Sequence, residues 1–81
     1  MKIILYSKTG CPWAAKMRNF LEERDVAYEE RDMTADPEFA REAEEKSGDT
    51  ISPTVDLDGE IYADTDAEEI AEALEEKGVT K

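Results

Sequence analysis

The sequence predicts an α/β protein in which helices cover both faces of a four-stranded mixed sheet, with the elements in the order β-α-β-α-β-β-α. A helical pattern separates the first two strand-like segments, which is typical of parallel strands. An Asp-Gly pair separates the last two, which is typical of an antiparallel hairpin. The chain has 81 residues, and we expect one small domain that spans residues 1–81.

The N-terminal segment Lys2–Ser7 predicts a buried strand, because it is rich in β-branched and aromatic residues. Lys8-Thr9-Gly10 then reads as a turn. Pro12 suits the first turn of a helix, where its missing N–H costs nothing and its fixed φ matches the helix. This helix is expected to end near Arg24-Asp25. Its apolar face consists of Ala14, Met17, Phe20 and Leu21.

The middle of the chain predicts a weaker strand and then a polar helix. Residues Val26–Met33 are strand-like, although their apolar and polar residues do not alternate cleanly. The segment Thr34–Glu38 carries a cap followed by a proline at the first helical position, and the helix is expected to run to about Lys46 with Gly48 just beyond. We expect it on the surface, because its only apolar stripe is Phe39, Ala40 and Ala43.

The last third of the chain predicts a hairpin and a closing helix. The segments Thr54–Leu57 and Glu60–Tyr62 flank the Asp58-Gly59 turn, the strongest local hairpin signal in the sequence. Thr65 stands three residues before Glu68, which is the spacing of a capping box at a helix start. An apolar stripe of Ile70, Ala71, Ala73 and Leu74 follows, with Gly78 as the expected stop.

The only cysteine, Cys11, lies between the first strand and the first helix. At the N-cap its sulfur would face unpaired backbone N–H groups and the positive end of the helix dipole, which favour a thiolate over a thiol. Lys8 adds positive charge nearby. We therefore predict that Cys11 is nucleophilic at neutral pH, against the alternative of a buried and unreactive cysteine.

The composition argues against several classes of function. A net charge of -12 predicts that the protein binds neither nucleic acid nor anionic membranes, because both would repel it. No apolar stretch is long enough to span a membrane and no signal-like segment is present, so we expect a cytoplasmic protein whose thiol stays reduced. No metal site is predicted, because the sequence has no histidine and no calcium-loop spacing of acidic residues.

The chain resembles the glutaredoxin family in three segments: Lys8-Thr9-Gly10-Cys11-Pro12-Trp13, Pro53 before the third strand, and the Asp58-Gly59 turn. This branch of the thioredoxin fold includes the short glutaredoxin-like redoxins that reduce ribonucleotide reductase. The resemblance covers essentially the whole chain and implies a thioredoxin-like fold. It also implies a monomeric thiol-disulfide oxidoreductase in electron transport and cell redox homeostasis, with no permanently bound cofactor. Glutathione or another small thiol is the implied co-substrate, and disulfide-containing proteins are the implied substrates.

The resemblance assigns a role to each matching residue of the site. Cys11 is the implied catalytic nucleophile, which forms a mixed disulfide. Lys8 and Pro12 are implied to activate its thiol, the first by its charge and the second by starting the helix. The residues implied to bind the substrate or glutathione are Trp13, Ser52, Pro53, Thr65 and Asp66.

Three departures from the family pattern bear on function. Ala14 replaces the second cysteine of dithiol members, so no internal disulfide can close. Ser52 stands where the family usually has the valine of Thr-Val-Pro, and its backbone can still contact a thiol substrate. Ala63-Asp64-Thr65-Asp66 replaces the Gly-Gly-x-Asp segment that receives the γ-glutamyl end of glutathione. There the N–H of Thr65 still offers a carboxylate site at a helix start, whereas Asp64 adds a negative charge.

Three alternatives stay open beside disulfide exchange at one cysteine. The first is a dithiol electron-donor redoxin served by thioredoxin reductase, in which Ala14 is a substitution for the second cysteine. The second is a non-enzymatic carrier in which two chains each supply Cys11 and a glutathione to a bridging [2Fe–2S] cluster. Pro12 and Trp13 argue against it, because cluster-carrying relatives usually have smaller and more flexible residues there. The third is a binding module without redox activity.

Overall fold

The computed structural model describes residues 2–78. The elements follow the predicted order, in a single run along the chain: β1 (Ile3–Ser7), α1 (Pro12–Glu23), β2 (Glu29–Asp32), α2 (Pro37–Ser47), β3 (Thr54–Leu57), β4 (Glu60–Tyr62) and α3 (Ala67–Glu76). Within these residues no helix is both long enough and apolar enough to cross a membrane.

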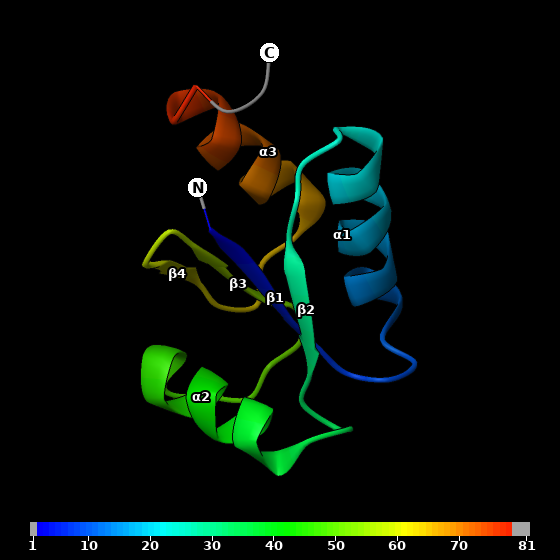
Figure 1. The fold of residues 1–81 in the computed structure, drawn as a ribbon, viewed down its shortest axis with the longest axis vertical. Coiled ribbons are helices and arrows are strands. Elements are labelled where there is room, and N and C mark those ends of the chain that lie inside the picture. Colours follow the sequence, from blue (N-terminus) through cyan, green and yellow to red (C-terminus); the bar gives the residue numbers. More distant parts are fainter. Residues whose placement is uncertain (1, 79–81) are drawn as a thin grey trace.

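The four strands form one mixed sheet in the order β2-β1-β3-β4 (Figure 1). β1 runs parallel to β2, as expected of two strands joined by a helix, and antiparallel to β3. β3 and β4 are antiparallel neighbours joined by the Asp58-Gly59 turn, in which Gly59 has a φ of 102°. The predicted mixed sheet with its C-terminal hairpin is therefore confirmed.

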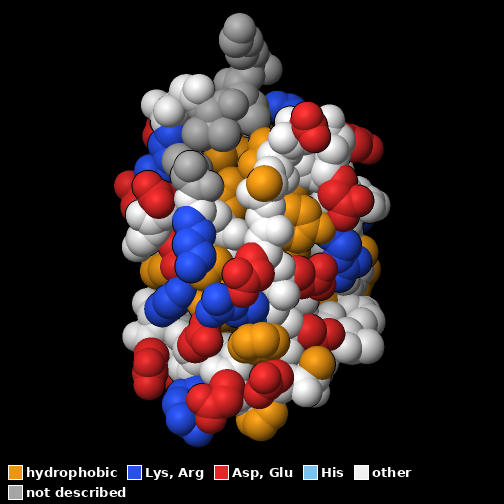
Figure 2. All heavy atoms as spheres, in the orientation of Figure 1, with side chains coloured by type: hydrophobic (Ala, Val, Ile, Leu, Met, Phe, Trp, Pro, Cys, Tyr) orange, Lys and Arg blue, Asp and Glu red, His pale blue; other side chains and the backbone are white. Residues whose placement is uncertain are grey.

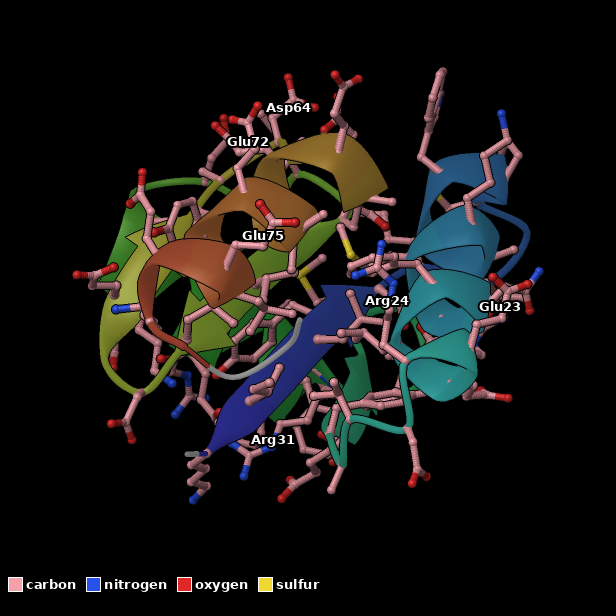
Figure 3. All side chains as sticks on the ribbon, turned by 90° about the horizontal axis from the view of Figure 1, so that it is seen from above. Glu23, Arg24, Arg31, Asp64, Glu72 and Glu75 are labelled. Carbon is pink, nitrogen blue, oxygen red and sulfur yellow. The ribbon has the colours of Figure 1, made fainter. Side chains whose placement is uncertain are left out.

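Helices cover both faces of this sheet, also as predicted. α1 and α3 lie side by side over one face (Figure 3), and α2 covers the other (Figure 1). Alternate residues of β1 point to opposite faces, so all five of its residues are buried. The core under α1 and α3 comprises Ile3, Leu5, Met17, Leu21, Val55, Leu57, Ile70, Ala73 and Leu74. The smaller core under α2 comprises Ile4, Tyr6, Met33 and Ala43.

The second strand differs from its predicted range. β2 begins at Glu29 rather than at Val26, because its ladder to β1 pairs only Ile4–Ser7 with Glu29–Asp32. Val26 and Tyr28 instead pack against the larger core without joining the sheet. The strand lies at the sheet edge and carries four charged residues, which explains the weak alternation of its sequence.

A polar network ties α2 to the sheet. Lys46 on α2 donates to the hydroxyl of Tyr6 and to the carboxylate of Asp56, each at 2.8 Å. The Tyr6 hydroxyl in turn donates to Glu42 at 2.9 Å, and Arg31 pairs with Glu42. Tyr6 is fully buried, so this network satisfies the one polar group of the smaller core.

On the face seen in Figure 2, acidic side chains are spread over the surface with Lys and Arg side chains between them.

Candidate functional site

The turn between β1 and α1 presents the only cysteine at the start of a helix. The N–H of Cys11 donates to the carbonyl of Lys8 at 3.1 Å, and Gly10 takes a φ of 81°, which a type II turn requires at this position. Pro12 is the first residue of α1, and Cys11 is its N-cap. No side chain of the cap closes the helix end, so the first N–H groups of α1 stay available to the sulfur. The predicted placement of Cys11 is confirmed.

The surroundings of Cys11 favour its thiolate. The side chain is partly buried, and burial alone would raise the pKa of the thiol. The Ser52 side chain and the backbone N–H groups at the start of α1 more than offset this, with a smaller contribution from the charge of Lys8. The pKa of Cys11 is therefore lowered from its ordinary value. The backbone groups concerned are those of Trp13 and Ala14, as the N-cap argument requires.

The loop before β3 lies against the thiol. The Cys11 sulfur is 3.8 Å from the carbonyl oxygen of Ser52, to which the thiol donates. The Ser52-Pro53 peptide bond is cis, and Pro53 is fully buried. The carbonyl of Pro53 accepts the N–H of Thr65 at 3.0 Å, which brings the start of α3 to the same edge. Cys11 and Ser52, from distant parts of the sequence, therefore meet at the sulfur atom, and a third part, the start of α3, is held against the neighbouring Pro53.

The start of α3 differs from the predicted capping box. Asp66, not Thr65, is the N-cap, and its carboxylate accepts the N–H of Glu69 at 2.8 Å. Thr65 is 4% exposed and its N–H is already donated to Pro53, so this N–H is not the free carboxylate site that the sequence suggests. The Thr65 hydroxyl contacts the Glu69 carboxylate instead. The helix end is closed by an acidic side chain of the protein itself.

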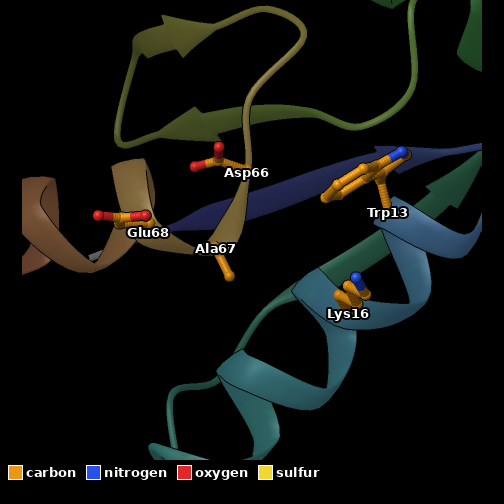
Figure 4. Close-up of a pocket in the computed structure, with 5 residues that line it drawn as sticks. All are labelled: Trp13, Lys16, Asp66, Ala67 and Glu68. Carbon is orange, nitrogen blue, oxygen red and sulfur yellow. The ribbon is translucent and has the colours of Figure 1, made fainter.

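Two shallow grooves border the exposed ring of Trp13, which is 56% exposed. In the first, of about 180 Å³, Trp13 and Lys16 from α1 face the start of α3 (Figure 4). The second, of about 170 Å³, lies towards Pro53. Both are smaller than most enclosed ligand sites, so they suit a segment that binds along the surface. Together the grooves are lined by Trp13, Lys16, Pro53, Asp64, Thr65, Asp66, Ala67 and Glu68.

These grooves carry an acidic border. Asp64, Asp66 and Glu68 supply three carboxylates, whereas Lys16 is the one basic residue that lines either groove among the described residues. The Lys16 ammonium lies 4.5 Å from the centre of the Trp13 ring, so part of its charge is directed at the ring. The potential of the grooves is therefore unfavourable for an anionic ligand.

Sequence reasoning missed a polar clamp that holds the turn before Cys11. The hydroxyl of Thr9 donates to Asp32 at 2.6 Å, and the N–H of Thr9 donates to the hydroxyl of Thr34 at 3.1 Å. Asp32 also accepts the N–H of Thr34 at 2.8 Å. The Asp-x-Thr pattern signals that last, local bond, but nothing in the sequence pairs Thr9 with a segment about two dozen residues away. The clamp ties the turn before Cys11 to the end of β2.

No metal centre is evident within residues 2–78, where no three acidic, cysteine or histidine side chains gather as ligands.

Comparison with known proteins identifies relatives along the chain. The glutaredoxin family model matches residues 3–62. A variant of the thioredoxin-like protein BC3987 has 30% sequence identity and a TM-score of 0.83, over 89% of this chain and 97% of that one. The glutaredoxin-like protein NrdH-redoxin from Escherichia coli has 22% identity and a TM-score of 0.74, over 89% and 93%. Buckwheat glutaredoxin, solved with glutathione, has 14% identity and a TM-score of 0.70, over 95% and 70%. A comparison with curated protein sequences finds no match.

Proposed function

Because this chain belongs to the glutaredoxin family, we propose that it is a thiol-disulfide oxidoreductase that works through a mixed disulfide at Cys11. The observation that carries the proposal is the position of the thiol. Its sulfur lies at the start of α1, where the pKa of Cys11 falls below the ordinary value despite burial. A thiolate is the reactive form in disulfide exchange.

The proposed reaction has two steps. The Cys11 thiolate attacks one sulfur of a disulfide, forms a bond to it and releases the other sulfur as a thiolate. Ala14 offers no thiol and the chain has no other cysteine, so no internal group can attack the mixed disulfide. An external thiol then attacks the substrate sulfur and releases the Cys11 thiolate. Two electrons pass from the external thiol to the original disulfide, and Cys11 ends unchanged.

Substrates are proposed to lie along the grooves beside Trp13. Glutathione is the small thiol that we propose as co-substrate, and disulfide-containing proteins as the larger substrates. The acidic border of Asp64, Asp66 and Glu68 disfavours the two carboxylates of each glutathione unit. Among disulfides of similar reactivity, the site should therefore favour neutral or cationic ones. A reduced thiol fits the cytoplasm, which we propose as the location.

A dithiol electron-donor redoxin is the second candidate, and one observation favours it. Ala14 lies in the first turn of α1, is fully buried, and its backbone N–H contributes to the lowered pKa of Cys11. A cysteine at this place would lie next to Cys11. The natural partner of such a protein would be a reductase rather than glutathione, in agreement with the acidic border.

Mass spectrometry of the intact protein tests the function. The reduced protein is mixed with glutathione disulfide, hydroxyethyl disulfide or cystamine, which are anionic, neutral and cationic. We expect one adduct per chain with each reagent, none with Cys11→Ser, and release of the adduct by added thiol. A parent protein that forms no adduct under conditions where free cysteine does so would contradict the proposal.

The same assay tests the role of the acidic border. The rate of adduct formation should rise from glutathione disulfide to cystamine, and the ratio of the cystamine rate to the glutathione disulfide rate should shrink at high salt. Asp64→Asn should reduce the ratio, because Asp64 lines the groove beside Pro53. Glu75→Gln is the matched control, since Glu75 lies further along α3, away from Asp64 (Figure 3). If Asp64→Asn and Glu75→Gln give the same ratio of rates, the acidic border does not influence the choice of substrate.

A further inference from the structure

The Ser52 hydroxyl is an unexplained polar group beside the reactive sulfur. Within residues 2–78, its Oγ is the one buried side-chain oxygen or nitrogen without a hydrogen-bond partner. Leaving a buried hydroxyl unpaired is unfavourable, and natural structures retain few such groups. Valine serves at this position in the family pattern, so the fold does not need a hydroxyl here. Its presence in this chain calls for a role.

The residue that carries this hydroxyl contacts the reacting sulfur through its backbone. The carbonyl of Ser52 lies 3.8 Å from the Cys11 sulfur and accepts its S–H in the thiol form. Ionisation removes this S–H and turns the sulfur into an acceptor, which a carbonyl oxygen repels. A hydroxyl proton rotates freely, so the Ser52 O–H can then donate to the sulfur. The thiolate therefore supplies the partner that the hydroxyl lacks in the thiol form.

We propose that Ser52 is a catalytic residue whose hydroxyl donates a hydrogen bond to the Cys11 thiolate, both when the thiolate attacks a disulfide and when it leaves a mixed disulfide. The inference rests on the proposed function, in which both steps occur. The lowered pKa of Cys11 agrees with it: burial opposes ionisation, and the Ser52 side chain is the largest of the effects that favour it. In release, an external thiol attacks the substrate sulfur, and the bonding electrons pass to Cys11, where the hydroxyl stabilises them.

The pH profile of alkylation isolates this bond. Alkylation rates of the reduced protein with iodoacetamide are measured against pH for the parent, Ser52→Ala, Ser52→Val and Ser52→Thr. Loss of a hydrogen bond to a charged group should lower the thiolate fraction about tenfold at pH values below the midpoint. The remaining thiolate is intrinsically more nucleophilic, so the net rate should fall only about threefold.

The variants distinguish the hydroxyl from the shape of the side chain. Ser52→Ala and Ser52→Val should both raise the midpoint. Ser52→Thr should have the midpoint of the parent, because threonine keeps the hydroxyl. Ser47→Ala is the matched control: its hydroxyl donates to the Ala43 carbonyl on α2, and its loss should leave the midpoint unchanged. Thermal unfolding checks the fold, and Ser52→Val carries the side chain that the family usually has.

A second readout follows the leaving step. The glutathionylated parent and Ser52→Ala are reduced by the same external thiol, and Ser52→Ala should release Cys11 severalfold more slowly. A parent-like midpoint in both Ser52→Ala and Ser52→Val would overturn the inference. Alkylation needs no disulfide, so the two proposals can fail separately. A Ser52-dependent midpoint without mixed disulfides would defeat the proposed function alone.

Discussion

Lys46→Met should lower the free energy of unfolding by about 2 kcal/mol. Lys46 donates to two groups of low exposure, the Tyr6 hydroxyl and the Asp56 carboxylate, and the Asp56 side chain is 11% exposed. A hydrogen bond to a charged group contributes about 1.5–3 kcal/mol, and breaking a fully buried ion pair costs about 3–5 kcal/mol. The Lys46 side chain keeps 32% of its surface exposed, so the lower part of this range applies. For a domain of this size the melting temperature should fall by about 10 °C.

The pH dependence of this loss follows from Asp56. Burial raises the pKa of Asp56, but hydrogen bonds from Lys46 and the Gly59 N–H, with the Lys46 charge, hold it below its ordinary value. A depressed folded-state pKa stabilises the protein above the unfolded pKa of about 3.9, and this stabilisation is lost as the pH falls through the folded pKa. Without Lys46 the carboxylate is buried with one donor fewer. The difference between parent and variant should therefore be largest near neutral pH and shrink in acid.

Urea unfolding followed by circular dichroism, at neutral pH and at pH about 3, measures both effects. Lys16→Met is the matched control, because Lys16 is an exposed helix residue whose ammonium lies over the Trp13 ring. The Cys11 alkylation midpoint should stay at the parent value in Lys46→Met, since α2 covers the opposite face of the sheet from α1. A loss equal to that of Lys16→Met, or one independent of pH, would refute the reasoning.

Three further predictions concern the thiol. The alkylation rate of Cys11 should have its midpoint below the value of about 8.5 for a free cysteine, because its pKa is lowered despite burial. A parent midpoint at or above the free value would mean that the helix start does not activate the thiol. Lys8→Gln should reduce the thiolate fraction about twofold at low salt and less at high salt. Ala14→Cys should form an internal disulfide with Cys11 and release bound glutathione at least tenfold faster without added thiol. Equal lifetimes of the two glutathionylated proteins would show that position 14 is not the resolving site.

The features that sequence predicts well here are decided by near neighbours. Pro12 starts a helix because of its own ring, and Asp58-Gly59 turns the chain because Gly59 accepts a positive φ. The apolar stripes of the three helices place their buried faces in the same way. The placement of Cys11 at the start of a helix is predictable for this reason too, since Gly10 and Pro12 directly before and after it set the turn and the first helical residue.

The features that sequence misses depend on partners far along the chain. Thr65 and Asp66 are both good N-caps, each with a glutamate three residues later, so the local pattern does not choose between them. In the structure the Thr65 N–H, which a capping box would donate to the glutamate side chain, is donated to Pro53, and Asp66 caps the helix. The start of β2 is likewise set by where β1 offers pairing partners. Sequence reasoning places Ser52 at the site through its backbone, but only the fold shows that its hydroxyl is buried without a partner.

The acidic cap at the start of α3, which the sequence did not predict, bears on the choice of substrate. A helix N-terminus attracts anions through its free N–H groups, which makes it a ready site for the carboxylate of a small peptide thiol. In this chain Asp66 already supplies a carboxylate to those groups, and Asp64 stands beside it. A second carboxylate from a ligand would meet a filled and negatively charged site. Under the proposed function, discrimination then passes to the sulfur end, where Cys11 and Ser52 control the thiolate, and to the exposed ring of Trp13, whose face attracts cationic rather than anionic groups.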